Sequence, residues 1–141
     1  MCSATTATNL SSWRGAPNDS PEQAPLVWGV WLMPRRCFAL DLGSDPELIA
    51  EYERLHEPGE VWPMVIEHIR ASGITDMQIW RTGDRLFMIA ETTDDYPRPI
   101  ETPPEVRHWE ELMWRFQRPL PHAAPGEKWI SMKRIFDLEE Q

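Results

Sequence analysis

The chain has 141 residues, a formal net charge of −9, eight tryptophans and two cysteines. This length suits one domain with a single core. The acidic balance argues against a nucleic-acid binder and an anionic membrane surface, and no apolar run approaches the ~20 residues of a membrane span. Because Cys2 lies in a polar N-terminal stretch, a disulfide with Cys37 is not expected, and a reducing, cytoplasmic location fits.

Residues 1–33 are expected to form a disordered or loosely attached tail. The first 25 residues are rich in Ser, Thr, Ala, Asn and Pro and show no hydrophobic period. The apolar stretch 26–33 suits either an extra edge strand or a segment laid over a subunit interface. The folded domain is therefore expected to occupy residues 34–141.

Hydrophobic periodicity and breaker residues divide the domain into alternating strands and helices. In chain order they predict a strand at 37–42, a helix at 46–56, a helix at 61–72, strands at 74–82 and 85–91, a helix at 104–118 and a strand at 129–138.

Two local signals mark the boundaries of these elements. Ser44 lies three residues before Glu47, which is the spacing of a capping box, so Ser44 is the expected N-cap of the first helix. Gly83-Asp84 is a two-residue hairpin turn signal. That turn places Trp80 opposite Phe87 on one face of the hairpin.

The order strand, broken helix, strand, strand, helix, strand is the split βαβ pattern of a ferredoxin-like α+β domain. Such a domain has an antiparallel sheet with helices on one face. The other face is expected to pack against the sheet of a second subunit, so the sequence predicts a homodimer. The ligand site is expected between the sheet and the helix ends.

Tyr52 and His56 lie four residues apart on the first predicted helix, and this spacing puts both side chains on one face. A phenol and an imidazole together can bind a hydroxyl-bearing ligand and move a proton to or from it. The same spacing is also typical of a half-buried helix face. Tryptophans likewise serve either as core residues or as flat platforms for a sugar ring.

The segment Tyr52-Glu53-Arg54-Leu55-His56 is followed by Trp62-Pro63, by Trp80 at a strand end and by Trp109 on the last predicted helix. This ordered set resembles the rhamnose/fucose mutarotase family, and the resemblance covers residues 36–138. It implies a small cofactor-free enzyme with a dimeric α/β barrel.

The resemblance also implies roles for individual residues. His56 matches the family's proton-donating histidine, Tyr52 its substrate-binding tyrosine, and Trp109 the second aromatic residue that holds sugar in the rhamnose branch. His108 stands in place of the first aromatic of that pair, and Met77 in place of a further substrate-binding tyrosine. The spacing from His56 to the next tryptophan is two residues longer than usual. The two replacements count against rhamnose more than against mutarotation.

The segments 109–117, 119–121 and 126–129 are most similar to the fucose-specific branch of the family. The expected function is therefore interconversion of the α and β anomers of a 6-deoxy-hexose, L-fucose first and L-rhamnose second. Trp80, Trp109 or Met77 would supply an apolar wall for the sugar methyl group. Two alternatives remain open: a cofactor-free oxygenase of the same barrel fold, and a non-catalytic dimer that binds a sugar or another metabolite.

The remaining charged residues are expected to be ordinary surface groups. His68, Glu110 and Glu111 are predicted to face solvent, and His122 lies in a loop near the expected cavity rim. The four histidines and two cysteines form no short cluster, so metal binding is not expected.

Overall fold

The computed structural model describes residues 26–27, 30–31 and 34–141 of the chain. Strands β1 (Leu26–Val27) and β2 (Val30–Trp31) pair with each other in a small antiparallel sheet of their own. The rest of the predicted tail lies outside the described residues.

The main sheet has five strands in the order β4-β5-β3-β6, with β7 also paired to β3, and the pairings are antiparallel. The strand bounds are β3 (Arg35–Leu42), β4 (Ile74–Thr82), β5 (Arg85–Thr92), β6 (Gln117–Arg118) and β7 (Ile130–Ser131). The helices are α2 (Pro46–Leu55), α3 (Pro63–Ala71) and α4 (Pro104–Met113), and a short 3₁₀ turn, η2 (Leu138–Glu140), follows near the C-terminus.

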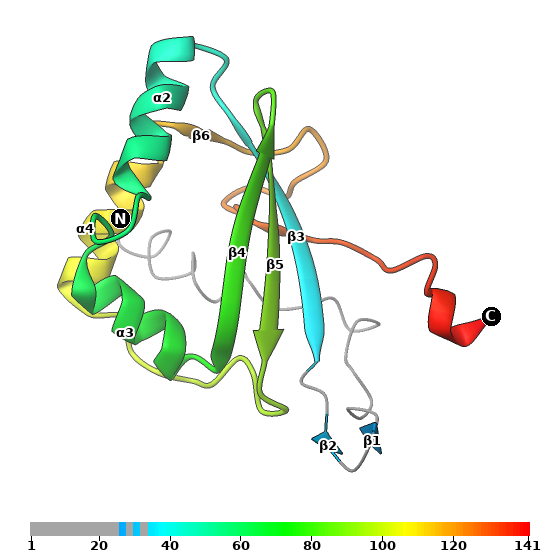
Figure 1. Cartoon of the computed structure of the whole chain (residues 1–141). Coiled ribbons are helices and arrows are strands. Elements are labelled where there is room, and N and C mark those ends of the chain that lie inside the picture. Colours follow the sequence, from blue (N-terminus) through cyan, green and yellow to red (C-terminus); the bar gives the residue numbers. More distant parts are fainter. Residues whose placement is uncertain (1–25, 28–29, 32–33) are drawn as a thin grey trace.

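Helices α2, α3 and α4 lie on one side of the sheet, as Figure 1 shows. The chain leaves β3, passes through α2 and α3, and returns as β4, which is separated from β3 by β5. Helix α4 makes the second crossover, from β5 to β6. This arrangement confirms the predicted α+β fold with its split βαβ connections.

The hairpin of β4 and β5 has the predicted register, with Trp80 opposite Phe87 and Ile79 opposite Met88. Gly83 has a φ of +56°, a left-handed conformation that glycine adopts without a steric penalty in a two-residue turn. Side chains alternate along a strand. Met88 is therefore fully buried toward the helices, whereas Trp80 is 59% exposed on the outer face.

Helix α2 starts at Pro46 as predicted, but its N-cap is Asp45, so the assignment of Ser44 as the cap was wrong. The Asp45 carboxylate accepts a hydrogen bond from the backbone N–H of Glu47, with 2.9 Å between Oδ1 and N. A carboxylate also interacts favourably with the positive end of the helix dipole. The helix ends at Leu55, one residue earlier than predicted.

The predicted helix over 104–118 is also shorter in the structure, where α4 ends at Met113. The N–H of Phe116 bonds to the Met113 carbonyl, which tightens the last turn. Gln117 then pairs with Leu42 in β6. The apolar spacing continues past the helix end because Phe116 is a core residue, but strand pairing decides the backbone conformation.

The strand predicted over 129–138 is reduced to β7. The N–H of Met132 still bonds to the Cys37 carbonyl of β3 at 2.8 Å. The chain then leaves the sheet, as the ribbon in Figure 1 shows. Beyond this point Ile135 and Phe136 are 89% and 63% exposed. A strand continues only where a neighbouring backbone supplies hydrogen-bond partners, and sequence alternation does not show where those partners end.

The hydrophobic core fills the space between the sheet and the helices. Phe38, Leu40 and Leu42, which were predicted to share one face of the first strand, are all buried there. His68 is buried as well, so its prediction as a solvent-facing residue was wrong. Helix α3 packs against both α4 and β4, and this places His68 inside rather than on a free surface.

A buried ion pair joins α4 to the loop before β7. The Nζ of Lys128 lies 2.5 Å from the Oε1 of Glu110, and both residues are buried, with Lys128 only 1% exposed. The Lys128 ammonium also lies 4.8 Å from the ring centroid of Trp114. The expectation that Glu110 faces solvent was therefore wrong, because α4 turns this acid toward a lysine that is distant in the sequence.

Breaking this ion pair is expected to destabilise the protein strongly. In Glu110→Gln, Lys128 keeps its buried charge without a counter-ion, and we expect the free energy of unfolding to fall by about 3 kcal/mol. The double variant Glu110→Gln, Lys128→Met removes both charges and should recover most of that loss. Denaturant unfolding of the parent and both variants measures this, and equal stability of Glu110→Gln and the parent would contradict it.

Candidate active site

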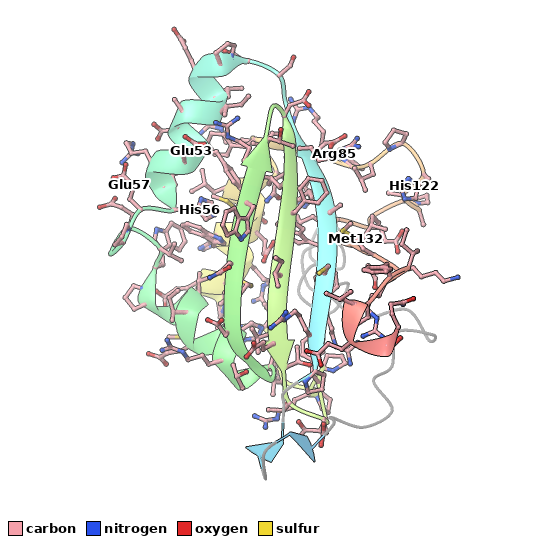
Figure 2. The ribbon with its side chains drawn as sticks, turned by 45° about the vertical axis from the view of Figure 1, so that its right-hand side comes forward. Glu53, His56, Glu57, Arg85, His122 and Met132 are labelled. Atoms are coloured by element: carbon pink, nitrogen blue, oxygen red, sulfur yellow. The ribbon has the colours of Figure 1, made fainter. Side chains whose placement is uncertain are left out.

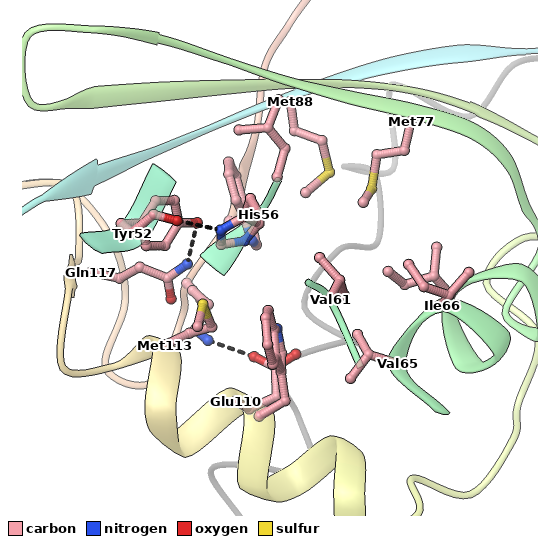
Figure 3. A pocket seen from close by; sticks show the side chains of 15 residues that line it. Tyr52, His56, Val61, Val65, Ile66, Met77, Met88, Glu110, Met113 and Gln117 are labelled. Carbon is pink, nitrogen blue, oxygen red and sulfur yellow. Dashed lines mark hydrogen bonds and ion pairs between the residues drawn. The ribbon is translucent and has the colours of Figure 1, made fainter. Parts of the chain in front are cut away.

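A cavity opens between the helices and the inner face of the sheet, with about 550 Å³ of empty space when its mouth is included. Figure 3 shows it with β4 and β5 on one side and α4 on the other. The polar members of its lining are Tyr52, His56, Glu110, Gln117 and Lys128. The other members are Val61, Val65, Ile66, Ile69, Met77, Ile79, Met88, Trp109, Met113 and Trp129. A few polar groups in an apolar wall are typical of a small-molecule site.

Helix α2 positions Tyr52 and His56 as the sequence spacing predicts. Their ring centroids are 4.3 Å apart, with the planes tilted by 34°. Because α2 ends at Leu55, the backbone N–H of His56 bonds to the Glu53 carbonyl. The Tyr52 carbonyl, its usual partner in a continuing helix, is 2.7 Å from the His56 Nδ1.

The Tyr52 carbonyl decides the tautomer of His56. A carbonyl oxygen only accepts hydrogen bonds, so Nδ1 must carry a proton and donate it. The lone pair of the neutral ring is then on Nε2. Burial lowers the pKa of His56 below its ordinary value, and the hydrogen bond to Tyr52 opposes this shift only in part. Near neutral pH the ring is therefore uncharged and able to accept a proton at Nε2.

The Tyr52 hydroxyl is held by Gln117 of β6. The Gln117 Nε2 donates a hydrogen bond to the Tyr52 Oη over 3.0 Å, and both side chains are buried. Burial raises the pKa of Tyr52, with the hydrogen bond from Gln117 acting against it, so the phenol stays protonated. Since its oxygen accepts from Gln117, the phenol hydrogen remains available for a ligand.

One tryptophan packs against the histidine, and a second packs against the first. Trp109 of α4 meets the His56 ring edge to face, with 5.6 Å between the ring centroids. Trp62, the residue before α3, meets Trp109 in the same manner at 5.2 Å. Trp109 therefore supports the imidazole on one side and keeps that side apolar, and Trp62 supports Trp109.

The Gln117 side chain leaves one polar atom unpaired. Its Oε1 is buried and has no hydrogen-bond partner in the part of the chain that the structure describes. An unsatisfied buried polar atom costs about 1–3 kcal/mol. Because Gln117 lines the cavity, a ligand hydroxyl would be a suitable partner for this oxygen.

The structure brings most of the predicted site residues together. His56, Tyr52, Trp109 and Met77 all line the cavity. Trp80 does not, because it points away from Met77 and Ile79 to the outer face of the sheet.

Two further histidines lie away from the cavity lining. His108 is exposed on α4, one position before the buried Trp109 and thus on another side of the helix. His122 is exposed in the loop after β6 (Figure 2).

Sequence reasoning missed Gln117, Glu110 and Lys128 as members of the site. The signal for Glu110 was present in helical spacing, since it lies four residues after the buried Val106 on α4. Gln117 lies in β6, beyond the end of the helix, where this spacing does not apply. Lys128 gave no such signal, because it lies in a loop that only the fold brings to α4.

Metal and membrane features are not found among the described residues. In residues 34–141 and the two short strands before them, no three His, Cys, Asp or Glu side chains form a group suited to a metal ion. None of the described helices is long and apolar enough to cross a membrane.

Residues 35–138 match the family model for L-rhamnose mutarotase. An L-fucose mutarotase of Xanthomonas campestris pv. campestris is 47% identical over 113 residues, which cover 77% of this chain and 90% of that protein. An L-rhamnose mutarotase of Acidiphilium cryptum is 29% identical over 105 residues, which cover 71% of this chain and 95% of that protein.

The fold is also similar to a solved structure. The crystal structure of an L-rhamnose mutarotase from Formosa agariphila superposes with a TM-score of 0.53 at 17% sequence identity, and covers 74% of this chain and 97% of that one. This likeness shows a shared fold. Since the family model spans most of the described domain, the chain belongs to the L-rhamnose mutarotase family.

Proposed function

We propose that the protein is a cytoplasmic sugar mutarotase for a 6-deoxy-hexose, L-fucose first and L-rhamnose next. The observation that carries this proposal is the neutral His56, whose Nδ1 is held by a carbonyl, whose Nε2 is left as a base, and whose ring packs against the Tyr52 ring. The L-fucose mutarotase at 47% identity supports the choice of sugar.

The reaction needs one group that takes a proton from the anomeric hydroxyl and one that gives a proton to the ring oxygen. His56 Nε2 takes the anomeric proton as the C1–O5 bond breaks and the C1 carbonyl forms. The Tyr52 hydroxyl gives its proton to O5. Burial disfavours the transient phenolate, and the imidazolium, whose ring centroid is 4.3 Å from that of the phenol, stabilises it. Rotation about C1–C2 then exposes the other carbonyl face.

Ring closure reverses both proton transfers. O5 attacks the carbonyl and returns its proton to Tyr52, while His56 returns its proton to O1, now on the other face. The methyl group of a 6-deoxy sugar suits the apolar part of the cavity, where Met77 and Met88 lie side by side (Figure 3).

His56 is expected to be essential for anomer exchange. NMR saturation transfer between the anomeric protons of L-fucose should show faster exchange with the parent protein than in buffer. In His56→Ala and His56→Gln the enzymatic part of this rate should fall about 10²–10⁴-fold, as for other general acid–base groups. His122→Ala changes an exposed histidine and should keep the parent rate. Parent activity no higher than buffer would refute the proposed function.

The pH dependence should report the neutral imidazole. We expect kcat/KM for L-fucose to be constant from about pH 7 to 8 and to decline on acidification, because protonation of Nε2 removes the base. Burial lowers the pKa of His56, so the midpoint should lie below the ordinary value of about 6.5. The rate in buffer alone is subtracted at each pH. A decline centred well above pH 6.5 would contradict this assignment.

We also propose that the protein forms a homodimer through the outer face of its sheet. The helices cover the inner face, whereas the outer face carries the exposed Trp80 beside the half-buried Phe87 and Ile89. An uncovered apolar sheet face of this kind is typical of an interaction surface.

A charge on that face should separate the subunits. Light scattering is expected to give twice the chain mass for the parent and the mass of one chain for Trp80→Glu, because the interface would bury an unpaired carboxylate. Ala50→Glu adds the same charge on the exposed side of α2 and should stay dimeric. A monomeric parent protein would contradict the proposal.

A further inference from the structure

The proposed mechanism uses only one end of the Gln117 side chain. Its side chain is 3% exposed, it lines the cavity, and it comes from β6 at the edge of the sheet rather than from a helix. One end of its carboxamide is committed, since Nε2 donates to the Tyr52 hydroxyl over 3.0 Å. The other end, Oε1, has no hydrogen-bond partner among the residues that the structure describes.

The rigidity of this side chain makes it suitable for recognition. The backbone of Gln117 pairs with Leu42 of β3, and the bond to Tyr52 restrains the orientation of its amide group. The unpaired oxygen therefore has a set position beside the reacting groups. A buried acceptor in a fixed place favours a ligand that has a hydroxyl there and disfavours one that lacks it.

We propose that the Gln117 Oε1 accepts a hydrogen bond from the C2 hydroxyl of the sugar and so helps to select L-fucose over L-rhamnose. This inference rests on the proposed mutarotase function. His56 acts at C1, Tyr52 lies against His56, and Gln117 bonds to Tyr52. C2 is bonded to C1, whereas C4 lies across the ring from C1. Contact with Tyr52 alone does not separate the two hydroxyls, because C2 and C4 each lie two bonds from O5. Figure 3 shows the end of the Gln117 side chain beside His56 as well, and a group beside the residue that acts at C1 reaches the C2 hydroxyl before the C4 hydroxyl.

The proposal gives Gln117 a consequence for specificity. L-Fucose and L-rhamnose differ in configuration at C2 and at C4, so an acceptor aimed at the C2 hydroxyl of one sugar is misplaced for the other. The neighbouring Met113 and Trp109 offer no side-chain carbonyl that would replace it. Gln117 therefore acts as a binding residue for the sugar and as a positioning residue for the Tyr52 hydroxyl.

The test changes the enzyme and the substrate separately and together, and measures the rate of anomer exchange for each combination. Parent protein and Gln117→Met are each measured with L-fucose and with 2-deoxy-L-fucose. Removal of the Gln117 carboxamide alone, or of the C2 hydroxyl alone, should lower kcat/KM about 10-fold to 100-fold. This is the range expected when one buried hydrogen-bonding group loses its partner. Loss of both should cost little more than Gln117→Met alone, because the same bond is removed twice. Gln117→Glu keeps an acceptor and should keep more of the preference for L-fucose over L-rhamnose than Gln117→Met.

The outcomes separate this inference from the proposed function. Parent protein that exchanges no sugar faster than buffer overturns both. Parent protein that is active and treats 2-deoxy-L-fucose like L-fucose overturns the role of Gln117 alone, and this comparison needs no variant. If the losses in kcat/KM from Gln117→Met and from 2-deoxy-L-fucose multiply when the two changes are combined, Gln117 supports the fold only. That result also overturns the role of Gln117 in binding the sugar. Gln141→Met, the same change at the exposed C-terminus, should match the parent.

Discussion

The contact on which the chemistry depends is the one between the Tyr52 carbonyl and the His56 Nδ1, 2.7 Å apart. It exists because α2 ends at Leu55, which turns the N–H of His56 toward Glu53 and leaves the Tyr52 carbonyl to the ring. The end of a helix thus selects a tautomer. The same residue that carries the phenol orients the imidazole, so the two groups keep a constant relation.

The polar groups around this pair are few, buried and largely matched to each other. Glu110 and Lys128 neutralise one another in the cavity wall, and Gln117 bonds to Tyr52. In an apolar surrounding such partners are needed, since an unpaired charge there is costly. Among the described groups, the Gln117 Oε1 is a buried polar atom without such a partner, and we therefore infer that it contacts the ligand.

The fold and half of the site were predictable because they depend on local patterns. Period-2 and period-3.6 spacing placed the hairpin register and the helical pair Tyr52 and His56 correctly. The resemblance gave Trp80 a role in the site without giving the face of the sheet, and the structure places this residue outside the cavity lining. The spacing patterns overextended α4, since a core position at Phe116 keeps the helical spacing after the helix has ended.

The sequence by itself determined which segments are strands and helices, and that a tyrosine and a histidine share one helix face. It did so because backbone geometry repeats along the chain and leaves its period in the order of apolar residues. Only the tertiary structure decided that Lys128 meets Glu110, that Gln117 meets Tyr52, and that these groups surround a cavity. These contacts join residues 18 and 65 positions apart, and no local period records a partner supplied by the folding of the whole chain.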